Sequence, residues 1–132
     1  MKLIIPGRLD GLNEYTNANR NNPYAGANMK KKNENVILKA VQACPDRQTF
    51  TEPVYIRFCW VEPNRRRDKD NIASAKKFCL DALVKANVLQ GDGWKYIIGF
   101  SDRFAVDNKN PHIEIEIITE EEMERRRANY KV

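Results

Sequence analysis

The sequence is poor in the residues that build disulfide frameworks and zinc sites. Its 132 residues include one histidine and three cysteines. Cys44, Cys59 and Cys79 are far apart and form no Cys-x-x-Cys pair, and His112 has no second histidine or cysteine at ligand spacing. This pattern excludes a disulfide scaffold and a zinc site built from cysteine and histidine. We expect reduced thiols and no metal-binding role for His112.

Long apolar runs are also absent. No stretch approaches the ~20 consecutive apolar residues that cross a bilayer. The N-terminus lacks the basic, apolar and small-residue pattern of a signal peptide, and the chain contains no repeat or low-complexity linker. We therefore expect a single domain over residues 1–132, located in the cytoplasm and without a membrane partner.

Positive charge, in contrast, is abundant and clustered. The chain has 23 Lys and Arg against 18 Asp and Glu, a formal net charge of +5. The two basic blocks are Lys30, Lys31 and Lys32, and Arg65, Arg66 and Arg67. Such blocks bind phosphate backbones by displacing condensed counterions, although a run of lysines is more often a solvated face. The distribution favours a polyanion partner.

Hydrophobic periodicity predicts a mixed α/β (α+β) fold, with a small mixed sheet of three to four strands packed against helices. The predicted strands are residues 3–5, 54–61, 94–106 and 112–118, the last two forming a hairpin around "DNKNP". The predicted helices run from Met29 to a point before Pro45, over 71–86 and over 119–127, with 12–28 as a loop or short helix.

The run "RRRDKDN", residues 65–71, contains most of the candidate metal-binding and phosphate-binding side chains. In an extended segment, side chains at i and i+2 project to the same side, so Asp68 and Asp70 can present their carboxylates together. Two adjacent anions repel unless a cation neutralises them, and Mg²⁺ is the usual cation. The alternative is that Asp70 or Asn71 caps a helix that begins at Ile72. The preceding arginines do not stabilise a helix N-terminus, but their planar forks match phosphate oxygens.

Two later residues can join this group. In a continuous helix, Lys77 points about 20° from the direction of Asp70, whereas Lys76 leans toward the buried stripe and is the weaker candidate. An i to i+4 surface pair of Lys77 with Asp81 is the alternative. Asp92 lies in a Gly-Asp-Gly turn after this helix, and the turn can return it to the site.

Taken in order, "RRRDKDN" and "KKFCLDALVKANVLQGDGW" resemble the RusA family of Holliday-junction resolvases, metal-dependent endonucleases of phage and prophage origin. The resemblance spans roughly residues 60–118. The family pattern is Asp-x-Asp-Asn at a helix start, a Lys in that helix, Asp-Ala-Leu near its end and a further Asp in the next turn. The matching residues are Asp68, Asp70, Asn71, Lys77, Asp81, Ala82, Leu83 and Asp92. Two departures are the longer spacing from Asp70 to Lys77 and the Gly91 that stands where many relatives have an acid.

The resemblance implies a homodimer with a mixed α/β fold that nicks opposed strands of four-way junction DNA in recombination and repair. It implies that Asp68, Asp70 and Asp92 hold Mg²⁺, with Mn²⁺ as a substitute, and that Lys77 stabilises charge on the phosphoryl group. The residues expected to bind DNA are Arg65, Arg66, Arg67, Asn71, Lys76, Lys30, Lys31 and Lys32.

Two other functions remain open at this point. One is a junction-binding or DNA-binding protein without catalysis, which would keep the basic blocks but gains nothing from three carboxylates beside its ligand. The other is a Mg²⁺-dependent nuclease that acts on forks, flaps or RNA, which would use the same residues.

Overall fold

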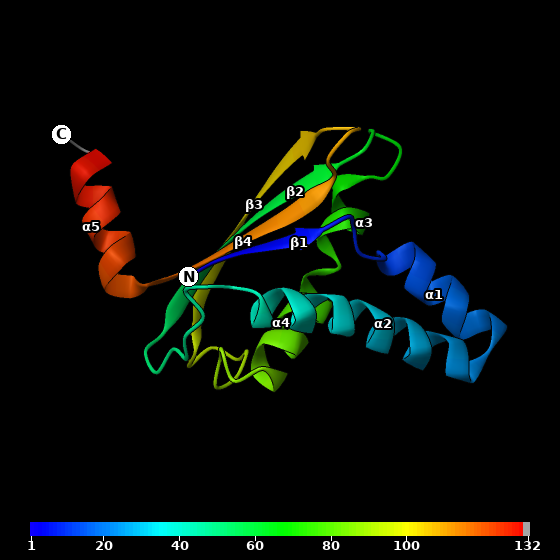
Figure 1. Ribbon diagram of the computed structural model, residues 1–132, viewed down its shortest axis with the longest axis horizontal. Helices are drawn as coiled ribbons and strands as arrows, with labels where there is room; N and C mark the ends of the chain where they lie inside the picture. Colours follow the sequence, from blue (N-terminus) through cyan, green and yellow to red (C-terminus); the bar gives the residue numbers. More distant parts are fainter. Residues whose placement is uncertain (131–132) are drawn as a thin grey trace.

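The computed structural model describes residues 1–130, which form one four-stranded sheet and five helices (Figure 1). The predicted mixed α/β fold with a small mixed sheet is confirmed. In chain order the elements are β1 (Lys2–Pro6), α1 (Leu12–Asn21), α2 (Pro23–Gln42), β2 (Val54–Glu62), α3 (Lys69–Ala73), α4 (Lys76–Lys85), β3 (Ile97–Val106), β4 (His112–Thr119) and α5 (Glu120–Tyr130).

The strands are arranged in the order β1-β4-β2-β3. β4 is antiparallel to both β1 and β2, and β3 is parallel to β2. The predicted hairpin of β3 and β4 is therefore wrong, because β2 lies between these strands and pairs with both. β2 is the most deeply buried strand, so a central position both covers its side chains and pairs its backbone on two edges. Residues 107–111 are long enough to cross one strand at a spacing of about 4.8 Å.

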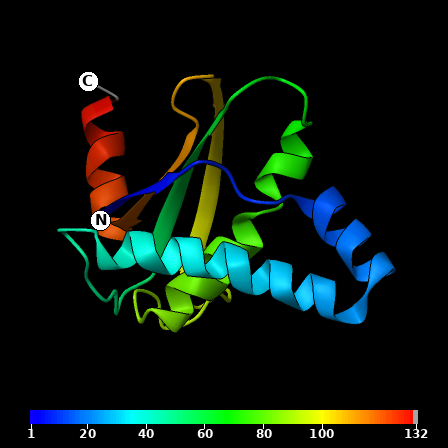
Figure 2. The ribbon, with the colours of Figure 1, turned by 45° about the vertical axis from the view of Figure 1, so that its right-hand side comes forward.

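One face of the sheet packs against α2 and α4, and the core lies in this layer (Figure 2). Alternate residues of the strands point into it, including Ile56 and Trp60 from β2 and Ile115 from β4. They meet Ile37 of α2 and Leu83 of α4. Full burial of one side chain of this kind contributes about 1.5–3 kcal/mol, so this layer dominates the stability of the fold.

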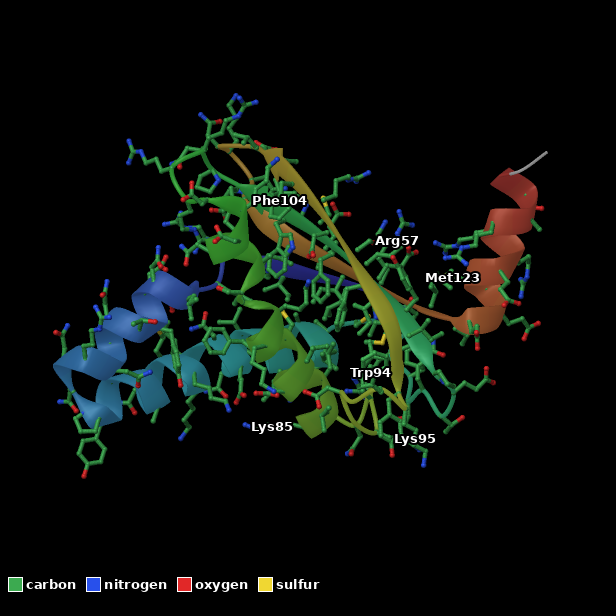
Figure 3. The ribbon with its side chains drawn as sticks, turned by 180° about the vertical axis from the view of Figure 1, so that it is seen from behind. Arg57, Lys85, Trp94, Lys95, Phe104 and Met123 are labelled. Carbon is green, nitrogen blue, oxygen red and sulfur yellow. The ribbon has the colours of Figure 1, made fainter. Side chains whose placement is uncertain are left out.

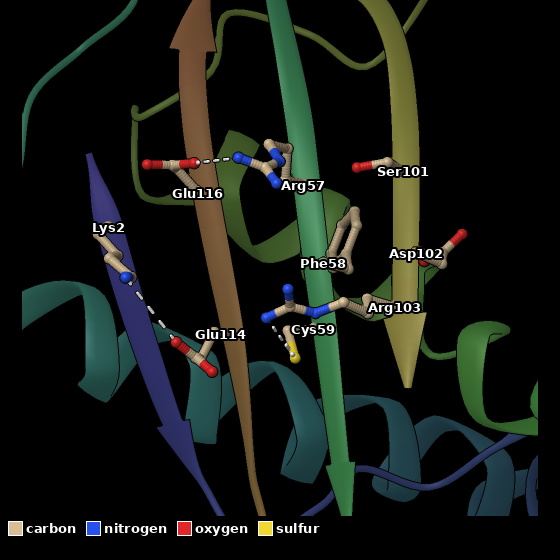
Figure 4. Close-up of a pocket in the computed structure, with 9 residues that line it drawn as sticks. All are labelled: Lys2, Arg57, Phe58, Cys59, Ser101, Asp102, Arg103, Glu114 and Glu116. Atoms are coloured by element: carbon tan, nitrogen blue, oxygen red, sulfur yellow. Dashed lines mark hydrogen bonds and ion pairs between the residues drawn. The ribbon is translucent and has the colours of Figure 1, made fainter. Parts of the chain in front are cut away.

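The opposite face of the sheet carries charged and polar side chains (Figure 4). Arg57 of β2 forms an ion pair with Glu116 of β4, with an N–O distance of 3.2 Å. Arg126 of α5 binds the same carboxylate at 3.0 Å, so α5 is tied to this face by charge. The alternation of inward isoleucines and outward glutamates along β4 was predicted from the sequence and is confirmed.

The predicted helix over residues 71–86 is two helices, α3 and α4, with a break at Ser74 and Ala75. The Ser74 hydroxyl accepts a hydrogen bond from the backbone N–H of Leu12, 2.7 Å away, at the start of α1. The same hydroxyl donates to the backbone carbonyl of Asn71. Serine side chains that bind backbone groups in this way compete with helical hydrogen bonding, which accounts for the break.

The Asn-rich segment is helical rather than a loop, and α2 begins at Pro23, earlier than the predicted start at Met29. The Asn22 side chain caps α2 by accepting a hydrogen bond from the N–H of Tyr24 at 2.8 Å. Proline suits the first position of a helix because its missing N–H would have no helical partner there. Within residues 1–130, no helix has both the length and the apolar character needed to span a membrane.

The two faces of the sheet should differ sharply in their tolerance of truncation. Ile115 is fully buried, whereas Ile4 on the opposite face is 49% exposed. We expect Ile115→Ala to lower the free energy of unfolding by about 2–4 kcal/mol because it leaves a cavity, and Ile4→Ala to lower it by less than about 1 kcal/mol. Urea unfolding of both variants measures this difference, and equal losses would contradict the assignment of the two faces.

Candidate functional site

Asp68 and Asp70 line a pocket of about 810 Å³ where β2, α3 and the end of β3 meet. Asp68 stands at the N-cap position of α3 in an extended conformation, and its carboxylate makes no capping hydrogen bond. Asp70 lies in the first turn. The alternative of a helix that begins at Ile72 and is capped by Asp70 or Asn71 is wrong, because α3 begins at Lys69.

Neither carboxylate has a partner within residues 1–130. The side chains of Asp68 and Asp70 are exposed and make no hydrogen bond or ion pair with the described residues, although three arginines precede them. Arg65 and Arg66 are exposed, and Arg65 lines the same pocket. Two carboxylates that share a pocket and form no ion pair with the described residues are available to an external cation.

Arg67 is directed into the protein, and its side chain is only 12% exposed. Its guanidinium binds the Glu62 carboxylate through two hydrogen bonds of 2.9 and 2.8 Å. It also donates to the Leu9 carbonyl at 2.9 Å and to Glu14 at 3.2 Å. Burial opposes the charge of Arg67, but hydrogen bonds and attraction from Glu62 and then Glu14 outweigh it, so its pKa is raised. The DNA contact of Arg67 stays a prediction, and in the structure its guanidinium donates to groups inside the chain.

Asn71 is likewise buried and structural. Its side-chain oxygen accepts a hydrogen bond from the backbone N–H of Asn13 at 2.9 Å, and its amide donates to Glu14 at 3.3 Å. Gly11 lies so close to Asn71 that a Cβ on residue 11 would be 2.5 Å from the Asn71 carbonyl oxygen, which explains the glycine at this position. Asn71 therefore joins α3 to α1, and its DNA contact stays a prediction.

Lys77 lies in a second polar cluster, formed with Asp81 and Asp92. Its ammonium is 3.0 Å from Asp81 and 3.3 Å from Asp92. Lys30 binds the other oxygen of Asp81 at 3.3 Å. Hydrogen bonding to Asp81 is the main cause of a raised Lys77 pKa, with a smaller contribution from Asp92. The surface pair of Lys77 with Asp81, which was the alternative interpretation of this lysine, is thus present.

The structure brings Asp92 to Lys77 but does not bring it to Asp68 and Asp70. No group of three or more His, Cys, Asp or Glu side chains within residues 1–130 is arranged to hold a metal ion. Figure 3 shows why: Phe104, which lines the Asp68 pocket, and Trp94, which follows Asp92, lie toward opposite ends of β3. Trp94 is fully exposed. The angle calculated between Asp70 and Lys77 does not hold either, because it assumed an unbroken helix.

Lys76 is held over the sheet rather than presented to a ligand. Its ammonium lies 2.8 Å from Asp102 and about 5 Å from the ring centres of Phe58 and Phe100. These contacts give Lys76 a packing role on the helix-covered face, and its DNA contact stays a prediction.

The lysine block of α2, like the arginine block, contains both residues paired inside the chain and an exposed residue. Lys30 is engaged with Asp81, and Lys32 forms a 3.1 Å ion pair with Asp10, whereas Lys31 is exposed. A cation that the sequence analysis did not select, Lys69, lines the pocket beside the two carboxylates, with its ammonium over the Phe104 ring. The position of Lys69 between Asp68 and Asp70 in "DKD" is the sequence feature that could have identified it as a residue of this pocket.

The internal role of Arg67 leads to a stability prediction. Arg67→Ala should lower the free energy of unfolding by about 3–5 kcal/mol, because it leaves the buried Glu62 carboxylate without its main partner. Arg66→Ala is the matched control, and this exposed neighbour should change stability by less than about 0.5 kcal/mol. Urea unfolding followed by circular dichroism compares them. A loss in Arg67→Ala no larger than in the control would refute the buried ion pair.

The ion pairs of Asp81 should make part of the stability sensitive to acid. Burial raises the pKa of this carboxyl group, but hydrogen bonds from Lys77 and Lys30 outweigh burial, so the pKa lies below its usual 3.8. The resulting stabilisation is fully present above the unfolded-state pKa and is lost as the pH falls through the lowered folded-state pKa.

Asp81→Asn should therefore destabilise the protein by about 1 kcal/mol at pH 7, and its difference from the wild type should shrink toward zero near pH 2. Urea unfolding at both pH values measures the two differences. A difference that does not change with pH would show that the charge of Asp81 is not what stabilises the fold.

Comparison with known proteins adds no family assignment: no protein-family model matches the chain, and no curated protein matches it at a significant level.

Proposed function

We propose that this protein is a Mg²⁺-dependent, structure-specific endodeoxyribonuclease that resolves four-way DNA junctions by paired nicks and acts as a homodimer in the cytoplasm. The observation that carries the proposal is the pair of exposed carboxylates, Asp68 and Asp70, which share a pocket and form no ion pair with any residue of 1–130. The ordered resemblance to RusA-family resolvases supports the choice of a junction as substrate.

The two carboxylates fit a magnesium ion in their chemistry. Mg²⁺ takes oxygen ligands and is usually bound by one or two carboxylates, with water and substrate phosphates completing its shell. Asp68 and Asp70 would hold the ion, and Mn²⁺ accepts the same oxygen ligands. The chemistry supplied by a bound ion is Lewis-acid polarisation of the phosphodiester.

The chain's own cations have a separate task, which is to position the DNA backbone. Arg65 and Lys69 line the same pocket as the carboxylates, and Arg66 is exposed next to Arg65 in the sequence. Guanidinium and ammonium groups at this place would bind the phosphates that flank the cut, which fixes orientation without reading the base sequence. Holding the scissile phosphate next to the acids would place it in the orientation that in-line attack requires, which lowers the entropic part of the barrier.

Lys77 and Asp92 keep their assignment only as a prediction. Their ion pair lies apart from Asp68 and Asp70 within residues 1–130, so a catalytic role requires that DNA or a second subunit bring the two groups into one substrate complex. A two-fold enzyme suits a near two-fold junction because each subunit can cut one of two opposed strands.

The test is cleavage of an end-labelled four-way junction beside linear duplex, fork and flap DNA of matched sequence, with Mg²⁺ or EDTA. The wild type should make symmetric nicks in the junction only with Mg²⁺. Asp70→Asn should lose more than about 100-fold in cleavage rate and still bind the junction, because it removes a metal ligand and not a phosphate contact. Glu52→Gln changes an exposed acid just before the start of β2, whereas the pocket lies at the end of that strand; this control should cleave normally.

Each other outcome has a defined meaning. Binding without cleavage under Mg²⁺ and Mn²⁺ would replace the nuclease with a junction-binding protein. Cleavage that prefers forks or flaps would keep the acidic pocket and change the substrate. Equal activity in Asp70→Asn and the wild type would reject the pocket as the active site.

A further inference from the structure

β3 is an edge strand whose outer edge is unpaired in the described chain. It lies at the end of the strand order and pairs only with β2 within residues 1–130. The edge extends over the ten residues of Ile97–Val106. A long free edge presents a row of backbone donors and acceptors to any strand that approaches it.

The two edges of the sheet are built differently. β1, at the other edge, has five residues and includes Lys2 and Pro6, both of which discourage strand addition. β3 is twice as long and contains neither lysine nor proline. It also exposes apolar side chains: Ile98, Phe100 and Val106 are 40%, 39% and 49% exposed. Of the two edges within residues 1–130, β3 is therefore the longer one and the one without lysine or proline, and its charged residues are limited to Asp102 and Arg103.

The sequence of β3 is nearly symmetric about Asp102. Reading outward from this residue, Ser101 matches Arg103, Phe100 matches Phe104, Gly99 matches Ala105, and Ile98 matches Val106. A two-fold interface is self-complementary, so residues opposite one another must fit in both directions. Antiparallel pairing of two β3 strands centred on Asp102 puts phenylalanine opposite phenylalanine, aliphatic opposite aliphatic, and small opposite small.

Neighbouring registers fit less well. When a two-fold axis joins two sheets, their core faces lie on the same side only if the paired residue numbers are both even or both odd. The closest alternative registers are therefore centred on Ser101 or on Arg103. The first places Phe100 opposite Asp102 of the second copy. The other places the two Arg103 side chains opposite each other. The Ser101 centre thus opposes an apolar to a charged group, and the Arg103 centre opposes like charges. The Asp102 centre also opposes two like charges, those of Asp102 itself.

The charge of Asp102 is already balanced before two copies meet. Its carboxylate binds Lys76 at 2.8 Å and accepts a hydrogen bond from the Trp60 indole at 2.8 Å. Two Asp102 residues at the axis would therefore meet as ion pairs and not as bare anions.

We infer that the free edge of β3 is the contact surface between two copies of this chain, paired antiparallel and centred on Asp102, so that two sheets join into one. The reason for a dimer comes from the proposed function, in which a two-fold enzyme cuts two opposed strands. The geometry of the interface is argued from β3 alone. Its test uses neither DNA nor metal, so its failure and the failure of the nuclease proposal are separate results.

Analytical ultracentrifugation of the full chain over a range of concentrations tests the surface. The wild type should be a dimer, and Phe100→Asp should weaken the dimer by at least about 30-fold in Kd, as expected for a central aromatic contact. Ile4→Asp changes an equally exposed residue on the other edge strand and should leave the dimer unchanged. Circular dichroism confirms that the variants are folded. A monomeric wild type, open-ended aggregates, or a dimer unaffected by Phe100→Asp would overturn the inference.

Disulfide cross-linking tests the register. Directly opposed residues have Cα atoms about 4.5–5.5 Å apart, within reach of a disulfide. With Cys44 and Cys59 replaced by serine and Cys79 fully buried, Ser101→Cys and Arg103→Cys chains should cross-link when mixed and not when either is alone. Self-linking of the Ser101→Cys chain or of the Arg103→Cys chain would select one of the neighbouring registers and reject the Asp102 centre.

Discussion

The buried ion pair of Arg67 with Glu62 is the contact on which the arrangement of the candidate site depends. It joins the end of β2 to the loop that leads into α3, and the same guanidinium reaches Glu14 of α1 and the Leu9 carbonyl. One side chain thus ties residues 62–67 to residues 9–14, two segments that are far apart in the sequence. Asp68 follows Arg67 directly, so its place at the mouth of the pocket is set by this anchor.

The ion pair of Arg67 also explains why three consecutive arginines have different environments. Arg65, Arg66 and Arg67 are chemically identical, but only Arg67 meets two internal carboxylates. Within residues 1–130, Arg65 and Arg66 have no such partner and are exposed. Arg67 therefore anchors this run from inside the protein, and the described residues form no ion pair with the carboxylates of Asp68 and Asp70 that follow it.

The sequence predicted best what depends on local pattern. The alternation of β2 and β4 identified their buried faces, because period-two spacing depends only on neighbouring residues. It could not identify their neighbours, since alternation tells which face of a strand is buried and not which strand lies beside it. The break between α3 and α4 escaped prediction because it depends on the contact of Ser74 with Leu12, a long-range hydrogen bond. Asp68 and Asp70 were predicted to share one place and do; Asp92 was expected there and lies with Lys77 instead.

The two tryptophans occupy opposite extremes of environment, and this makes the protein its own reporter. Trp60 is buried, stacked on Phe58 and hydrogen bonded to Asp102, whereas Trp94 is fully exposed near Asp92. A buried indole emits at shorter wavelength than one in water. The blue side of the fluorescence spectrum therefore follows the core, and the red side follows the loop after α4, so a ligand that touches only that loop can be distinguished from one that loosens the whole sheet.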